Sequence, residues 1–270
     1  PLTGRKYEFL LLPLSTGEMI SHTNPITETR LLEQRLLYGM YPGVISEPGN
    51  EPRLLKYLSG SYLYKDVFSF QDIRKPEIVE SLLEALALQV GNEVSTHELA
   101  TQLQMARATV ERYLDLLEQT YVIFRLPSFS TNPRKEIAKG RKVFFWDTGI
   151  RNALLNAFST DELRPDIGAL WENWVIAEVA KGNALRGGPA ELFFWRSRAQ
   201  SEVDLVVKQG DALRAFEVKW SGRRAAGRAF RIEQGSTISY ESIEYPNPRL
   251  DILASTRIRG SGLDPISGEA

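Results

Sequence analysis

The pattern of apolar and polar positions predicts mostly helices in the first third of the chain. Residues 5–12 are an exception, because they form an apolar run that Pro13 ends, which predicts a buried strand. Leucines along residues 27–38 predict a short helix, and residues 53–68 predict another. A further helix is expected to begin at Pro76, since proline is tolerated in the first turn of a helix.

The next segment has the pattern of a helix-turn-helix. Ser95 and Glu98 have the spacing of a capping box, and a break follows at Gln104. The second helix would present one apolar face, made of Val110, Leu114, Leu117 and Tyr121. Two strands, YVIFRL and KVFFWD, come next. Helix, turn, helix and strand pair together predict a winged helix-turn-helix.

The second helix of this segment carries candidate DNA contacts. Arg107, Thr109 and Arg112 would face the phosphates. The same helix carries three acids that repel phosphates, namely Glu111, Asp115 and Glu118. A module for packing or protein contact is therefore an open alternative.

From Gly168 onward the expected order of elements is α-β-β-β-α-β. The first helix is strongly apolar and contains Glu172 between Trp171 and Trp174. We expect both tryptophans in the core, and also Trp195 of the first strand. The remaining elements are three strands, LFFWR, EVDLVV and RAFEVKW, a short helix over 227–234, and weak strands over 237–245 and 249–254.

Two of these strands flank a two-residue loop, Gly210–Asp211. Glycine at the first loop position suits a type II′ turn, so paired residues should have numbers summing to 421. This register places one apolar set on one face, made of Val203, Leu205, Phe216 and Val218. The opposite face would carry Glu202, Asp204, Glu217 and Lys219.

Asp204 would then lie directly across the strand pair from Glu217. Opposed like charges destabilise a sheet, and a divalent cation would relieve them best. Lys219, two residues after Glu217, could orient a water and stabilise charge on a phosphate. A solvated charged face of an amphipathic sheet is the alternative interpretation.

Composition narrows the classes of function. The chain has 270 residues, no cysteine, two histidines and a net charge of −1. The absence of cysteine excludes disulfide bonds and thiolate zinc sites, and two distant histidines disfavour a histidine-based metal cage. A reducing cytoplasm is expected. We expect no membrane span, and no ATP binding, because a GxxxxGK[ST] loop is absent. Because the sequence starts at Pro1, we expect it to be part of a longer chain.

Taken together, these motifs resemble a known family. Glu172, Asp204 and the run Glu217-Val218-Lys219 resemble the core of the PD-(D/E)XK nuclease superfamily. The segments LTGRKYEFLLLPLS, KVFFWDTGIRNALL, LWENWVIAEV, FFWRSRAQSEVDLVV and FEVKW are similar to AAA+ class ATPases that carry such a nuclease-like domain, of unknown function, at their C-terminus. In that family a P-loop domain precedes the LTGR segment, and this sequence lacks it.

The resemblance implies a role for each site residue. Asp204 and Glu217 would hold Mg²⁺ or Mn²⁺, Lys219 would be the catalytic lysine, and Glu172 an accessory acid. Apart from the resemblance, a basic cluster follows the lysine, formed by Arg223, Arg224, Arg228 and Arg231, and it predicts either contact with a nucleic-acid backbone or a solvated basic face. The implied function is a Mg²⁺-dependent nuclease acting on DNA, with a non-catalytic DNA- or protein-binding module as the alternative.

The expected division of the chain has four parts. Residues 1–68 would be the remnant of an ATPase module, and residues 69–160 the winged-helix region. Residues 161–258 would form the nuclease-like domain, and the glycine-rich residues 259–270 a flexible tail.

Overall fold

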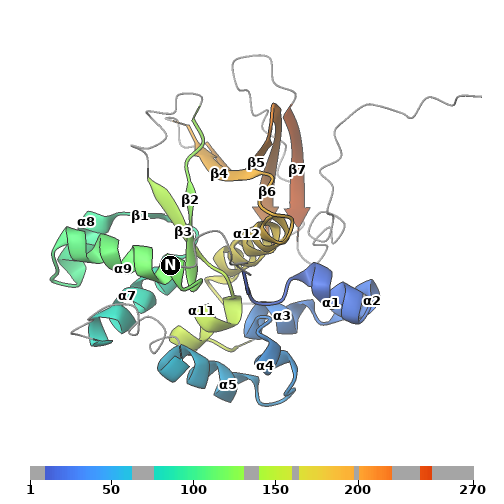
Figure 1. Cartoon of the computed structure of the whole chain (residues 1–270), viewed down its shortest axis with the longest axis horizontal. Helices are drawn as coiled ribbons and strands as arrows, with labels where there is room; N and C mark the ends of the chain where they lie inside the picture. Colours follow the sequence, from blue (N-terminus) through green and yellow to red (C-terminus); the bar gives the residue numbers. More distant parts are fainter. Residues whose placement is uncertain are drawn as a thin grey trace, which may run out of the picture.

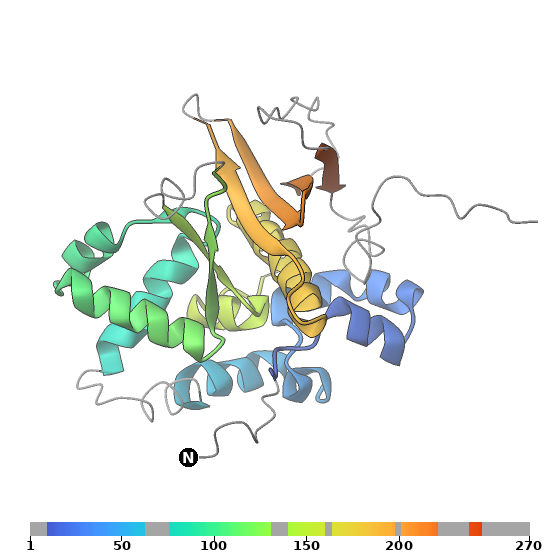
Figure 2. The same cartoon turned by 45° about the horizontal axis from the view of Figure 1, so that its top comes forward.

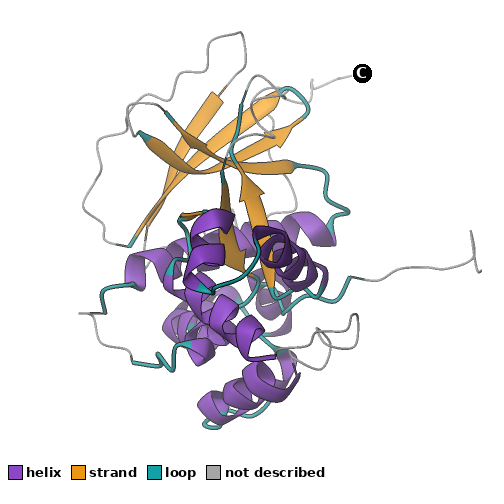
Figure 3. Ribbon diagram, turned by 90° about the vertical axis from the view of Figure 1, so that its left-hand side faces the viewer, coloured by secondary structure: helices purple, strands orange, loops and turns teal. Residues whose placement is uncertain are grey.

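The structure, a computed structural model of the chain, describes residues 10–62, 76–130, 140–159, 164–197, 201–220 and 238–244. The strands gather on one side of the molecule and the helices on the other (Figures 1 and 3). The chain is therefore a mixed α/β protein, as its pattern predicts.

Short helices form the first part of the described chain. They are α1 (Thr16–His22), α2 (Pro25–Arg30), α3 (Leu32–Tyr38), α4 (Pro42–Ile45), α5 (Glu51–Tyr57) and a π-helical turn, η1 (Leu58–Tyr62). The α-helices begin where local signals favour them, since the Ser15 hydroxyl caps α1 and the Asn24 side chain caps α2, which has a proline in its first turn.

The structure differs from two expectations for this part and describes only part of the segment of a third. The single helix expected over 27–38 is broken at Leu31, and Arg35 of α3 reaches back to Glu28 of α2, with 3.0 Å between Nε and Oε2. The helix expected over 53–68 is confirmed over residues 53–62, as α5 followed by the π-helical turn η1, and residues 63–68 lie outside the described residues. Residues 10–12 form no strand, and Leu11 is 86% exposed; residues 1–9 are not described.

The middle of the chain has the predicted order of helix, turn, helix and strands. Its elements are α7 (Pro76–Leu88), β1 (Glu93–Val94), α8 (Thr96–Gln102), α9 (Arg107–Gln119), β2 (Ile123–Pro127) and β3 (Arg141–Phe145). Ser95 caps α8 by accepting a hydrogen bond from the Glu98 N–H at 3.3 Å. Gln104, with a φ of 52°, lies at the predicted break. The strands form an antiparallel sheet in the order β1-β3-β2.

The apolar face predicted for the second helix is correct except at its end. Val110, Leu114 and Leu117 of α9 are buried. Tyr121 lies beyond the helix, with a φ of 56°, and its side chain is 43% exposed. The helix ends before Tyr121 because the chain has to turn there to enter β2.

The last part of the chain pairs one long helix with a second sheet. Its elements are α11 (Thr148–Leu154), α12 (Ile167–Leu185), β4 (Glu191–Arg196), β5 (Glu202–Gln209), β6 (Ala212–Lys219) and β7 (Ile238–Glu244). The sheet order is β4-β5-β6-β7, with β7 parallel to β6. The helix expected over 227–234 and the strand over 249–254 fall outside the described residues.

The two sheets are joined through β2 and β4 (Figure 2). Ser128, just after β2, forms a parallel bridge with Phe194 of β4. The Phe129 N–H donates to the Phe194 carbonyl oxygen at 2.6 Å, and the Phe129 ring packs edge-on against Phe193. Strands from the middle and the end of the chain therefore form one connected layer.

Helix α12 lies beneath this layer and connects it to the other helices (Figure 1). Trp171 and Trp174, both buried, stack with 5.2 Å between ring centroids, which confirms their predicted place in the core. Trp195 is only partly buried and packs against a smaller apolar cluster on the sheet. The main core includes residues from α1 through β7, so one continuous interior holds the described chain together. Among the described residues, no helix is long and apolar enough to cross a membrane.

Candidate functional site: an acidic cluster between the two sheets

The predicted hairpin between β5 and β6 positions the candidate site. Leu205 pairs with Phe216 and Gln209 with Ala212, so the predicted sum of 421 is confirmed. Gly210 has a φ of 59°, as the first loop position of a type II′ turn requires.

The side chains at the start of β5 depart from the predicted faces. The pairing of β4 with β5 shifts between Phe193 and Trp195, because β5 uses one residue more than β4 in this stretch. Val203 consequently packs with Phe129 and Val206, whereas Leu205, Phe216 and Val218 belong to the main core. The expectation that Val203 shares the face of Leu205 was therefore wrong, because a β-bulge reverses the alternation of side chains at this point.

Asp204 lies at this bulge, and its carboxylate turns toward β6. The Val218 N–H donates to Asp204 Oδ2 at 2.7 Å. Burial raises the pKa of Asp204, an effect that this hydrogen bond and the charges of Lys142 and Lys219 offset only in part. The carboxylate of Asp204 is thus anchored to the backbone of β6 through Oδ2.

Glu172 projects from α12 toward the same place. Its Oε1 lies 3.0 Å from Lys142 Nζ, and its side chain is 17% exposed. Burial raises its pKa to about 7; Lys142 opposes this shift, while the charge of Asp204 adds to it. Near neutral pH the Glu172 carboxyl can therefore exist with or without its proton.

Lys219 completes the predicted group from β6. Its Nζ lies 2.6 Å from Glu217 Oε1. Burial would lower the pKa of Lys219, but the hydrogen bond and charge of Glu217, together with the charges of Asp204 and Glu172, raise it. The lysine is therefore a cation that interacts electrostatically with all three predicted acids.

A chain of ion pairs extends the site toward β1, and no local pattern in the sequence predicts it. Lys142 of β3 contacts Glu172 and also Glu202, with 2.5 Å between Nζ and Glu202 Oε1. Arg196 of β4 contacts Glu202 at 2.8 Å and Glu93 of β1 at 3.1 Å. We name Glu172, Lys142, Glu202, Arg196 and Glu93 the ion-pair chain. Lys142 could not be predicted, because its partners Glu172 and Glu202 lie 30 and 60 positions later in the chain, and only the tertiary fold brings them to it.

The structure thus brings together Glu172, Asp204 and Lys219, with Glu217 paired to Lys219. That the Asp204 and Glu217 carboxylates face each other stays a prediction, since one accepts from the Val218 N–H and the other pairs with Lys219. In the described ranges, no group of three or more acidic or imidazole side chains converges as a metal centre. Two carboxylates still suit Mg²⁺, which keeps several waters and takes one or two carboxylate ligands.

The other predicted residues lie apart from this cluster or outside the description. Arg107 pairs with Glu111 on α9 at 2.9 Å, and Arg112 lies over the Tyr113 ring, 5.4 Å from its centroid. The basic residues Arg223, Arg224, Arg228 and Arg231 fall within residues 221–237, which are not described.

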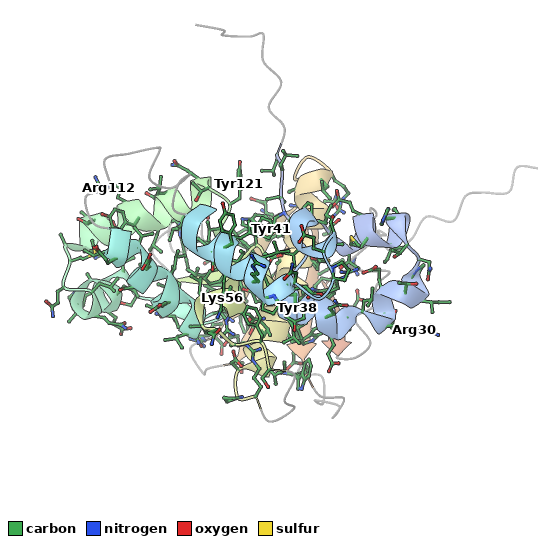
Figure 4. The ribbon with its side chains drawn as sticks, turned by 90° about the horizontal axis from the view of Figure 1, so that it is seen from below. Arg30, Tyr38, Tyr41, Lys56, Arg112 and Tyr121 are labelled. Atoms are coloured by element: carbon green, nitrogen blue, oxygen red, sulfur yellow. The ribbon has the colours of Figure 1, made fainter. Side chains whose placement is uncertain are left out.

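Two cavities lie away from the acidic cluster. One, of about 520 Å³, lies beside α8, α9 and β3, and its lining includes Arg107, Arg125 and Arg141. The other, of about 640 Å³, is mainly apolar, and its lining includes Tyr41 and Tyr121. Figure 4, which views the molecule from below, labels these two tyrosines.

Comparisons with known proteins give matches to domains whose functions are not known. Residues 29–161 match a domain of unknown function, DUF8612, and residues 167–244 match another, DUF4143. The second of these occurs in the C-terminal region of AAA-ATPase-associated proteins. The boundary between the matches falls just before α12.

The relatives found are longer than this chain. Uncharacterized proteins of Mycobacterium tuberculosis and Mycobacterium bovis are each 32% identical over 148 residues, which are 54% of this chain and 33% of theirs. An uncharacterized protein of Haemophilus influenzae is 26% identical over 229 residues, 80% of this chain and 54% of its own. No solved structure matches.

Proposed function

We propose that α12 and the sheet β4–β7 form a PD-(D/E)XK nuclease-like domain that cuts DNA with the help of Mg²⁺ or Mn²⁺. The observation that carries this proposal is the place of Asp204. Its carboxylate accepts from the Val218 N–H on β6 through Oδ2 and interacts with the charges of Lys219 and Glu172. In this proposal Oδ1 would bind the cation. A solvated charged face would leave these groups in water instead.

Each residue has a distinct role in this proposal. Asp204 and Glu217 would hold the cation, which, when bound, supplies charge stabilisation and a water of lowered pKa. Lys219 would orient the attacking water and stabilise negative charge on the phosphate. Glu172, whose pKa is raised to about 7, would hold or release a proton beside the cluster.

The test is a cleavage assay on plasmid DNA and on single-stranded oligonucleotides with millimolar Mg²⁺ or Mn²⁺. We expect the parent chain to cut, and Lys219→Ala to lose at least about 100-fold in rate, the scale on which positioned catalytic groups act. Lys208→Ala is the matched control, because Lys208 lies on the same sheet and pairs with Glu191, far from Asp204 in the hairpin. No cutting by the parent, or equal cutting by both variants, would contradict the proposal.

One observation favours the second candidate, a DNA- or protein-binding module that keeps the fold without catalysis. Lys142 already pairs with both Glu172 and Glu202, so the repulsion between these two carboxylates is reduced without an added ion. In that case α8, α9 and the β2–β3 pair would act as a winged helix-turn-helix, with Arg107 and Arg112 toward the DNA backbone. Salt-dependent duplex binding by an uncleaving parent, weakened by Arg112→Ala, would support this function.

The second domain match and the longer relatives support a wider setting. We propose that the chain is the C-terminal part of a cytoplasmic AAA+ type ATPase whose P-loop domain lies outside this sequence. ATP hydrolysis would then belong to the longer protein. A calorimetric titration of this chain with a nucleotide analogue should show no tight binding, and tight binding would contradict the assignment.

A further inference from the structure

Lys142 is held in place on both sides by its own sheet. In the strand registers, Lys142 lies opposite Glu93 of β1 and opposite Leu126 of β2. Its side chain is only 3% exposed, and its Nζ lies 5.5 Å from the centroid of the Phe194 ring. The ammonium group is therefore fixed at the junction of the two sheets, with little freedom to turn away.

Its two ionic contacts come from different elements. Glu172 Oε1 of α12 lies 3.0 Å from Nζ, and Glu202 Oε1 of β5 lies 2.5 Å from it. An ammonium group has three donors, so both contacts can be hydrogen bonds at once. The lysine thus joins two carboxylates that would otherwise repel each other in a partly buried place.

A divalent ion bridging the same two carboxylates would need the same position. Mg²⁺ binds carboxylate oxygens at about 2.0–2.1 Å, which leaves no room for an ammonium group between them. Entry of the ion would also bring two positive charges against a buried third one, which is costly away from water.

We infer that Lys142 is a built-in cation that replaces a second divalent ion, so that the Glu172–Glu202 side of the cluster takes no metal. This inference rests on the proposed function only for the first ion, which Asp204 and Glu217 would hold. It assigns to Lys142, a residue of the sheet β1-β3-β2, a positioning role in a site formed by α12 and β4–β7.

The test counts Mn²⁺ ions bound per chain, by calorimetry and by electron paramagnetic resonance of free Mn²⁺. Lys142→Met keeps the length of the side chain and removes its charge, whereas Lys142→Arg keeps the charge. We expect Lys142→Met to bind one more Mn²⁺ than the parent, and Lys142→Arg to bind the same number as the parent. The double variant Lys142→Met/Glu202→Gln should lose the added ion. An unchanged count in Lys142→Met would overturn the inference.

The difference between variant and parent, and not the parent's own count, decides the role of Lys142. A parent that binds no Mn²⁺ contradicts the proposed function, and a gained ion in Lys142→Met still supports the built-in cation. Where Lys142→Met is unfolded without metal, millimolar Mn²⁺ should restore its near-UV circular dichroism, because the ion replaces the ammonium group. Failure of Mn²⁺ to restore the fold would contradict the inference.

Discussion

At the scale of single residues, the cations around a partly buried carboxyl group determine whether it stays ionised. Asp166, before α12, shows a carboxylate with ample cationic partners. Arg164 Nε lies 2.5 Å from Asp166 Oδ1, and Arg151 contacts Oδ2. Burial alone would raise the pKa of Asp166, but the hydrogen bonds from Arg164 and Arg151 outweigh it and lower the pKa to about 2.

Asp166→Asn should therefore destabilise the protein in a pH-dependent way. The lowered pKa means that the charged Asp166 stabilises the fold above the unfolded pKa, and that this stabilisation is lost as the pH falls toward about 2. At pH 7 we expect a loss of about 2 kcal/mol, the scale of hydrogen bonds to charged groups. Urea unfolding of both chains at pH 7, 4 and 2.5 measures the difference. A gap that stays constant over this range would show that the charge of Asp166 is unimportant.

The sequence indicated the candidate residues of the site better than their partners. Asp204 and Lys219 were predicted from the register of the hairpin, and Glu172 from the resemblance to the PD-(D/E)XK nuclease superfamily. Lys142 and Glu202 could not be paired in this way, because no local pattern records that the Lys142 side chain of β3 reaches Glu202 of β5. Asp204 accepts a hydrogen bond from the Val218 N–H, whereas Glu217 pairs with Lys219. The place of Asp204 depends on the bulge in β5, and no residue type or spacing in the sequence predicts that bulge.

At the scale of elements, the β5–β6 hairpin shows how much a short turn determines. The loop Gly210–Asp211 fixed the register in advance, and the pairs from Leu205–Phe216 to Gln209–Ala212 confirm it. A turn constrains only its own two strands, so the contact of β5 with β4, where the bulge lies, could not be derived from it. Helix ends were predicted where capping residues mark them, as at Ser95, and wrongly near Tyr121, where no such signal exists.

Substitutions at two uncrowded glycines, Gly210 and Gly168, test the effect of a positive φ on stability. Gly210 and Gly168 both have no heavy atom within 4 Å of an added Cβ, but only Gly210 has a positive φ, of 59°. Gly210→Ala should cost about 1 kcal/mol, because an L-residue is strained in this conformation. Gly168→Ala, in the first turn of α12, should instead stabilise the protein by up to about 1 kcal/mol. Denaturant unfolding measures both, and equal effects of the two changes would contradict the assigned turn.

At the scale of the whole molecule, the two matched domains share one interior. The main core includes Leu82 of α7, Phe144 of β3 and Phe216 of β6. The bridge between Ser128 and Phe194 joins their sheets, and the ion-pair chain crosses the same junction. The domain boundary at residue 160 stays a prediction. We expect the regions on its two sides to unfold together, because they share this interior.

Calorimetric heating should therefore show one unfolding transition for the full chain. Phe129→Ala should lower the stability of the whole protein by about 3–5 kcal/mol, because it removes a buried ring that packs against Phe193 across the junction. Its single transition should move to lower temperature without splitting. Two separate transitions in the parent would show that the two regions fold independently.

The central claim is that Asp204 belongs to a site for a divalent cation, and thermal melts with and without millimolar Mg²⁺ test it most directly. A ligand that binds only the native state, at about ten times its Kd, adds about 1.4 kcal/mol, which corresponds to roughly 3 °C in a chain of this size. We predict this rise for the parent and for the control Asp211→Asn, in the hairpin loop, and a much smaller rise for Asp204→Asn. Melts of all three chains that Mg²⁺ and Mn²⁺ leave unchanged would contradict the claim.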